Sequence, residues 1–95
     1  MTIIECPADL DIANAATLRL QLLDALQTRQ PLEIDGQAVR KIHAAVLQLF
    51  LSLIIAAKAR ATPVRWRNPS AALVESAQLL GLVESLGLES ASRNS

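Results

Sequence analysis

The chain has 95 residues, enough for one domain with a single hydrophobic core. Hydrophobic residues make up 52% of it and only Phe50 and Trp66 are aromatic, so we expect an aliphatic core. Nine basic residues balance nine acidic ones, and the basic residues are scattered. This balance argues against nucleic acid or an anionic membrane surface as the partner.

The first thirty residues predict two strands and a helix. A strand is expected over residues 2–6, and a second over 8–12, where apolar and acidic residues alternate. From 13 to 28 the apolar residues recur at helical spacing. Either Asp11 or Asn14 can cap the start of this helix.

The rest of the chain alternates between strand and helix patterns. Strands are predicted over 31–35 and 62–68, and helices over 44–61, 68–81 and 82–86. Asn68 and Pro69 suit the start of the third helix, and Gly81 suits its exit. The order β-β-α-β-α-β-α predicts a small single-domain α/β fold over residues 1–88, a mixed sheet of about four strands covered by three to four helices. We expect the polar residues 89–95 to be a disordered tail.

Side chains suited to chemistry are few. Cys6, the only cysteine, excludes an internal disulfide, and we interpret it as a small core residue. His43, the only histidine, has no Ser or Cys close in sequence, and we interpret it as a surface or capping residue. Asp9 and Asp11 share a strand face, as many solvated acidic residues do. The three glycines form no phosphate-binding loop. The sequence therefore predicts no enzyme, no metal site and no cofactor.

The most apolar segment, residues 44–57, is too short for a membrane span, which needs about 20 residues. The first ten residues also lack the basic and long apolar regions of a signal peptide. We therefore expect a cytoplasmic protein with no membrane insertion.

The predicted helix over 44–61 has an unusual outer face, because no charged residue lies between Lys41 and Lys58. A helix that packs on one side of a small sheet normally carries charge on its outer face. Two interpretations stay open. Neighbouring helices bury most of this surface, or the surface is an apolar docking patch for another protein.

The order of the elements and three sequence segments resemble the STAS family, the fold of bacterial anti-sigma factor antagonists. The resemblance covers residues 6–88. ADLDIANAATLRLQLLDAL resembles the family's second strand and first helix, and PLEIDGQAV its central strand and following turn. TPVRWRNPSAALVESAQLLGL is similar to its last strand and final helix.

Members of this family carry Asp-Ser-x-Gly-Leu, or Thr in place of Ser, before the second helix. A partner kinase that is also the anti-sigma factor phosphorylates that hydroxyl. The matching residues here are 43–47, His-Ala-Ala-Val-Leu, so Ala44 stands at the acceptor position and only Leu47 is retained. The resemblance therefore implies a binding module that works independently of phosphorylation at this site.

What the resemblance implies for function is a non-enzymatic interaction module in bacterial signalling. Its partner would be an anti-sigma or kinase-like regulator or another component of a signalling complex, in an anti-sigma, chemotaxis-cluster or lipid-transport setting. A STAS domain that binds a nucleotide or another small ligand is the alternative, and a homodimer is left open. The expected partner-binding residues are Arg40, Lys41, His43, Ala44, Ala45, Leu47, Gln48, Leu51, Ser52 and Ile55.

Overall fold

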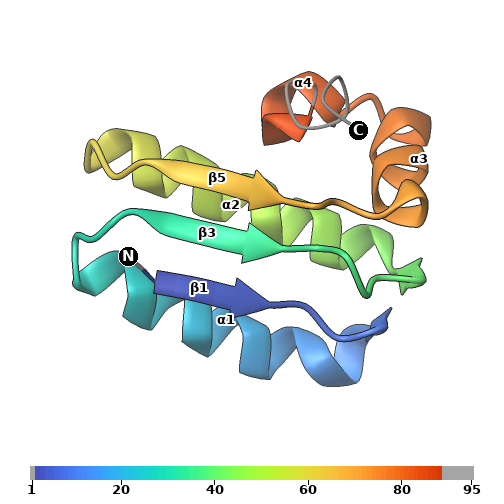
Figure 1. Cartoon of the computed structure of the whole chain (residues 1–95), viewed down its shortest axis with the longest axis horizontal. Helices are drawn as coiled ribbons and strands as arrows, with labels where there is room; N and C mark the ends of the chain where they lie inside the picture. The colour runs from blue at the N-terminus through green and yellow to red at the C-terminus, as the bar shows by residue number, and fades with distance from the viewer. Residues whose placement is uncertain (1, 89–95) are drawn as a thin grey trace.

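The computed structural model describes residues 2–88. Its centre is a parallel three-stranded sheet in the order β1-β3-β5 (Figure 1). The register aligns Ile4 with Ile34, and Ile34 with Trp66, so three distant parts of the chain meet side by side. The strands are β1 (Thr2–Glu5), β3 (Leu32–Asp35) and β5 (Val64–Arg67).

The helices lie mainly on one side of this sheet. They are α1 (Ile12–Gln27), α2 (Ala44–Ala59), α3 (Ala71–Leu79) and α4 (Val83–Leu86). Helices α1 and α2 cover one face, whereas α3 and α4 lie near the carboxyl end of β5 (Figure 1). Among the described residues, no helix has the length and apolar character that crossing a membrane requires.

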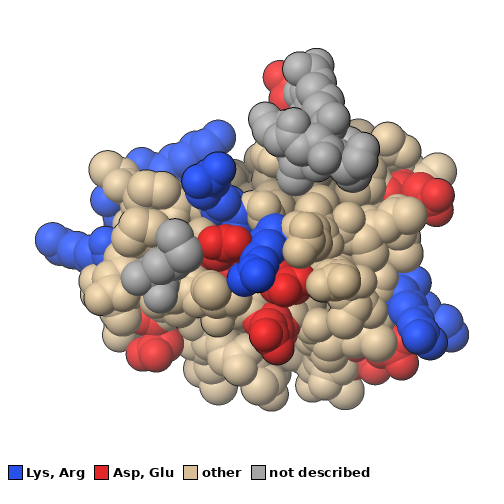
Figure 2. Space-filling model, viewed as in Figure 1, with Lys and Arg blue, Asp and Glu red and all other residues tan. Residues whose placement is uncertain are grey.

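The core fills the space between the sheet and helices α1 and α2. Leu32 and Ile34 of β3 are buried there together with Leu22 and Phe50. Because side chains alternate along a strand, the residues between them face the opposite side of the sheet. No described helix covers that side, and acidic and basic side chains gather on it (Figure 2).

A second, smaller sheet is separate from the first. It pairs β2 (Asp9–Leu10) with β4 (Lys41–Ile42) in parallel. The predicted α/β class is confirmed, but the sheet arrangement differs from the expected one. The described strands form two sheets, and their pairs are parallel throughout, where we expected one mixed sheet of about four strands.

Two further differences concern strand and helix boundaries. The predicted strand over 8–12 shortens to Asp9–Leu10 because Asp11 leaves the strand to cap α1, where its Oδ1 accepts a hydrogen bond from the Asn14 N–H at 2.9 Å. Helix α3 begins two residues after Pro69, since Asn68 adopts a left-handed φ of 47° that no helix start accommodates. Ser70 caps it instead, with Oγ accepting from the Leu73 N–H at 3.1 Å. The predicted tail lies outside the described residues.

Candidate docking surface

The turn between β3 and the loop before α2 is held by a glycine. The Gly36 N–H donates to the Arg67 carbonyl at 3.1 Å, and its own carbonyl accepts from the Val39 and Ser70 N–H groups. A Cβ at this position would lie 2.8 Å from Leu73 Cδ2, closer than van der Waals contact allows. A side chain at residue 36 would therefore force the buried Leu73 side chain of α3 to shift.

The loop that follows is fixed to β2 by backbone hydrogen bonds. The Ala8 carbonyl accepts from the Arg40 N–H at 2.8 Å and from the Lys41 N–H at 3.1 Å. The Leu10 carbonyl accepts from the His43 N–H at 2.8 Å. These bonds set where α2 begins and present the side chains of Arg40 and Lys41 to solvent.

His43 is the N-cap of α2. Its Nδ1 accepts a hydrogen bond from the Ala45 N–H at 3.0 Å, which satisfies one of the N–H groups that a helix start leaves unpaired. The predicted capping role is confirmed. The acceptor role also means that Nδ1 carries no proton in this arrangement. Helix α2 then starts at Ala44, whose side chain is exposed.

One face of α2 is exposed and uncharged over its whole described length up to Lys58. Residues four or three apart lie on one helix face. The exposed members of that row are Ala44, Gln48, Ser52 and Ile55. Ile55 is 61% exposed and is the large apolar side chain of this row; Ile12, Leu20 and Leu79 are also strongly exposed elsewhere on the domain.

Two of the predicted partner-binding residues are placed differently. The Leu47 side chain is only 1% exposed and belongs to the core, so it presents no surface to a partner. Leu51 is half-buried and packs against the core cluster. The cause is the helix period, which turns position 47 toward Val46 and Phe50 on the buried face. The other eight expected residues are brought together around the start and outer face of α2, and all eight are exposed.

The charges near the start of α2 are unpaired. Within residues 2–88 one ion pair forms, between Arg67 Nε and Glu33 Oε1 at 3.8 Å, on the open sheet face. Neither Arg40 nor Lys41 takes part in one, although Asp9 is the register neighbour of Lys41. Their cationic groups are therefore available to a partner's carboxylates.

Cys6 has the properties of a core residue. It is 4% exposed, and its N–H donates to the Asp35 carbonyl at 2.9 Å. Burial, assisted by the negative charge of Asp35, raises the pKa of the thiol from an ordinary 9.0 to about 12. A nucleophilic cysteine needs a lowered pKa. Among the described residues, no three His, Cys, Asp or Glu side chains come together in a way that could hold a metal ion.

Sequence reasoning missed the β2–β4 pairing that positions the loop. Strand β4 has two residues, too few for any periodic pattern. The signal that was present is the alternation around Leu10, which predicts a strand there but names no partner for it. Ala8 and Leu10, whose carbonyls hold residues 40–43, therefore support the surface without having been predicted to do so.

Comparison with curated proteins gave no match. A family model described as "Mlab, STAS domain" matches residues 2–89, which is most of the chain. The parallel α/β arrangement and the placement of residues 43–47 at the start of α2 agree with the resemblance seen in the sequence. The chain belongs to the STAS domain family, whose members generally mediate protein–protein interactions.

Proposed function

We propose that this protein is a non-enzymatic interaction module that binds another protein through the start and outer face of α2. The docking surface consists of the exposed expected residues: Arg40, Lys41, His43, Ala44, Ala45, Gln48, Ser52 and Ile55. It combines an uncharged helix face, on which Ile55 is the large apolar side chain, with two unpaired cations at one end. A partner with an apolar patch bordered by carboxylates complements it.

The observation that carries this proposal is the position of Ala44. It is the exposed first residue of α2, where the resemblance places a phosphorylated hydroxyl. A phosphate there would bring strong negative charge to the centre of the surface. A methyl group cannot accept one, so position 44 stays uncharged. Binding is therefore independent of phosphorylation at this position.

The partner belongs to bacterial signalling in this proposal. It is an anti-sigma or kinase-like regulator, or a component of a signalling complex in an anti-sigma, chemotaxis-cluster or lipid-transport setting. The family membership supports the general role, and the unpaired Arg40 and Lys41 support an acidic rim on the partner.

Site-specific crosslinking in cells of the native host tests the proposal. A photo-reactive amino acid replaces Gln48 on the docking surface and, as the matched control, Gln78 on the exposed side of α3. We expect one partner protein to crosslink at position 48 and not at position 78. Equal crosslinking at both positions, or at 78 alone, contradicts the proposed surface.

Two measurements separate this function from its alternatives. Intact-mass analysis of protein isolated from the same cells should show no phosphate on residues 39–50. Thermal unfolding in the presence of ATP, GTP and their diphosphates should show no shift. Stabilisation by a nucleotide without any crosslinked partner would assign the protein to the ligand-binding STAS domains instead.

A further inference from the structure

The outer edge of β1 is not paired with any described strand, because β1 stands at the end of the order β1-β3-β5. The Thr2 N–H donates to the Pro31 carbonyl at 3.0 Å, and the Cys6 N–H donates to the Asp35 carbonyl. The backbone N–H and C=O groups of the even-numbered residues therefore point toward β3. Backbone groups alternate in direction along a strand. The N–H and C=O groups of Ile3 and Glu5 therefore point outward, away from the sheet.

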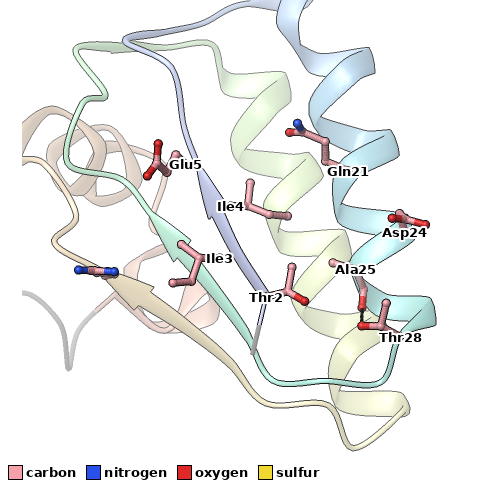
Figure 3. A pocket seen from close by; sticks show the side chains of 9 residues that line it. Thr2, Ile3, Ile4, Glu5, Gln21, Asp24, Ala25 and Thr28 are labelled. Atoms are coloured by element: carbon pink, nitrogen blue, oxygen red, sulfur yellow. Dashed lines mark hydrogen bonds between the residues drawn. The ribbon is translucent and has the colours of Figure 1, made fainter.

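A hollow of about 600 Å³ borders this edge, between β1 and α1. All four residues of β1 line it, and its other wall is formed by Gln21, Asp24 and Ala25 of α1 and by the C-cap residue Thr28 (Figure 3). Helix α1 lies outside the β1 edge rather than directly behind it in the view of Figure 1. A further strand added beside β1 would therefore lie over α1, in the same way that β3 and β5 lie over helices.

The opposite edge of the sheet is different. There the Trp66 Nε1–H donates to the Leu86 carbonyl at 2.7 Å, which holds α4 close to β5 (Figure 1). Edge strands are usually protected by such a cover, by charge or by short length. β1 has a charged residue, Glu5, and a large apolar side chain, Ile3, which is 47% exposed. The charge selects among incoming strands rather than blocking all of them.

The charge around the β1 edge is acidic. Glu5 and Asp24 are exposed, and neither forms an ion pair within residues 2–88. Arg67 also lines the hollow; its side chain is 50% exposed, and its charge is balanced by Glu33 on β3, whose Oε1 lies 3.8 Å from Nε. Glu5 extends on the open sheet face and Asp24 on the α1 side, so an added strand would meet a carboxylate on each of its two faces (Figure 3).

We propose that the β1 edge binds an extended, basic segment of another protein as an additional strand. Hydrogen bonds to Ile3 and Glu5 hold its backbone, Lys or Arg side chains contact Glu5 and Asp24, and an apolar side chain covers Ile3. A second copy of this chain is the poorer occupant. Two β1 edges placed together would bring two sets of Glu5 and Asp24 into one interface, and like charges oppose such pairing.

This site is separate from the docking surface, because none of the docking-surface residues lines the hollow. The test uses a blocked basic peptide, acetyl-KVKVKVK-amide, and its acidic counterpart, acetyl-EVEVEVE-amide. Each is titrated into the ¹⁵N-labelled protein up to about 1 mM, a range that detects the weak affinity expected of so short a strand. The basic peptide should shift the amide signals of Ile3 and Glu5 and slow their exchange with solvent. The acidic peptide should not.

Three variants make the test specific. Ile3→Pro removes the outward N–H while leaving the hydrogen bonds to β3 intact, and Ile3→Val is its matched control. Asp24→Lys reverses the charge on the α1 wall. We expect Ile3→Pro and Asp24→Lys to weaken peptide binding by about tenfold, and Ile3→Val to leave it unchanged. If Ile3→Pro does not fold, Asp24→Lys and the wild-type amide exchange decide the question.

The proposal is overturned if the acidic peptide binds equally well, or if the shifted amides lie away from β1 and α1. It is also overturned if the wild type dimerises in sedimentation experiments and Ile3→Pro abolishes the dimer, because the edge would then join two copies of this chain. Ala44→Asp, which alters the docking surface alone, should bind the peptide as the wild type does. Failure of the function proposed above would therefore leave this result unaffected.

Discussion

At the scale of single residues, Cys6 illustrates how position determines reactivity. It follows β1 directly, and the backbone bond to Asp35 continues the sheet pairing and draws its side chain into the core. The thiolate would lose its hydration there and would lie near the Asp35 carboxylate, so the pKa is raised to about 12. The thiol of the folded protein therefore keeps its proton at any physiological pH.

The raised pKa of Cys6 predicts a loss of stability in alkaline solution. The unfolded chain releases the thiol proton near the ordinary 9.0, whereas the folded chain holds it to about 12. Between these values the unfolded state binds fewer protons, so the free energy of unfolding falls as pH rises, by roughly 1–2 kcal/mol between about pH 8 and about pH 10.5. Urea unfolding of wild type and Cys6→Ala at both pH values measures it.

The comparison with Cys6→Ala isolates the contribution of the thiol, because the two proteins share every other side chain. The variant should show a smaller fall in stability over the same range. Iodoacetamide should modify the wild type slowly in buffer and rapidly in urea. Equal pH slopes in the two proteins, or fast modification of the folded protein, would show that the thiol is not buried as described.

The roles of single residues were predictable where they depend on neighbours in sequence. His43 caps the helix that starts one residue later, and Asp11 caps one that also starts one residue later. Asn68 was predicted as a cap and is not one, because its left-handed backbone belongs to the turn out of β5. That turn is fixed by the Ser70 N–H donating to Gly36, a contact between distant segments that no local pattern contains.

At the scale of elements, the first turn of α2 can be altered without altering the fold. Ala44→Asp places a carboxylate in the first turn of α2, at the positive end of the helix dipole. Stability should be unchanged or raised by about 0.3–1 kcal/mol. Partner binding should fall, because the new negative charge stands in the centre of a docking surface whose own charges are the cations of Arg40 and Lys41, and it imitates a phosphate. Urea unfolding and a binding assay with the crosslinked partner measure the two effects.

Ala16→Asp is the matched control, since Ala16 is also an exposed helical alanine but lies on α1. It should leave partner binding unchanged. An Ala44→Asp protein that binds as tightly as wild type would move the interface away from the start of α2.

The outer face of α2 offers a second test at this scale. Ile55 is 61% exposed, and Leu51, one turn earlier, is half-buried against the core. Ile55→Lys should therefore weaken partner binding at little cost in stability, within about 0.5 kcal/mol. Leu51→Lys should reduce stability by about 1–3 kcal/mol, because the charged end must leave the packed position. The same unfolding and binding assays distinguish the two variants.

The reverse result, a stable Leu51→Lys and a destabilised Ile55→Lys, would mean that α2 is rotated relative to the described packing.

The helix period predicts the buried residues Val46, Phe50 and Ala57 correctly from sequence. It does not settle Leu51, which lies at the boundary between the two faces. Boundary positions depend on what packs beside the helix, and the sequence of α2 alone does not contain that information.

At the scale of the whole molecule, the strand patterns predicted the class of the fold but not its pairing. Alternation in β3 and β5 identifies strands, yet nothing local aligns Ile34 with Trp66 or leaves β1 at the edge. Parallel pairing joins segments about thirty residues apart through helical crossovers, so its order follows from global packing. The residues of the proposed docking surface lie within one continuous segment, so a sequence pattern can group them. The β1 hollow, formed by segments from β1, α1 and β5, cannot be grouped in this way.

Trp66 links three parts of the molecule and so reports on its integrity. Its Nε1–H donates to the Leu86 carbonyl of α4, and its ring meets Phe50 of α2 edge-on, with centroids 5.1 Å apart. Trp66→Phe keeps an aromatic ring in β5 but leaves that carbonyl without its donor, so we expect a loss of about 1–3 kcal/mol in stability. Urea unfolding followed by far-ultraviolet circular dichroism measures it, with Leu79→Ala as the control. Leu79 is 87% exposed, and its truncation should change stability by less than about 0.5 kcal/mol. Equal stability of Trp66→Phe and wild type would show that α4 is not held to the sheet through this bond.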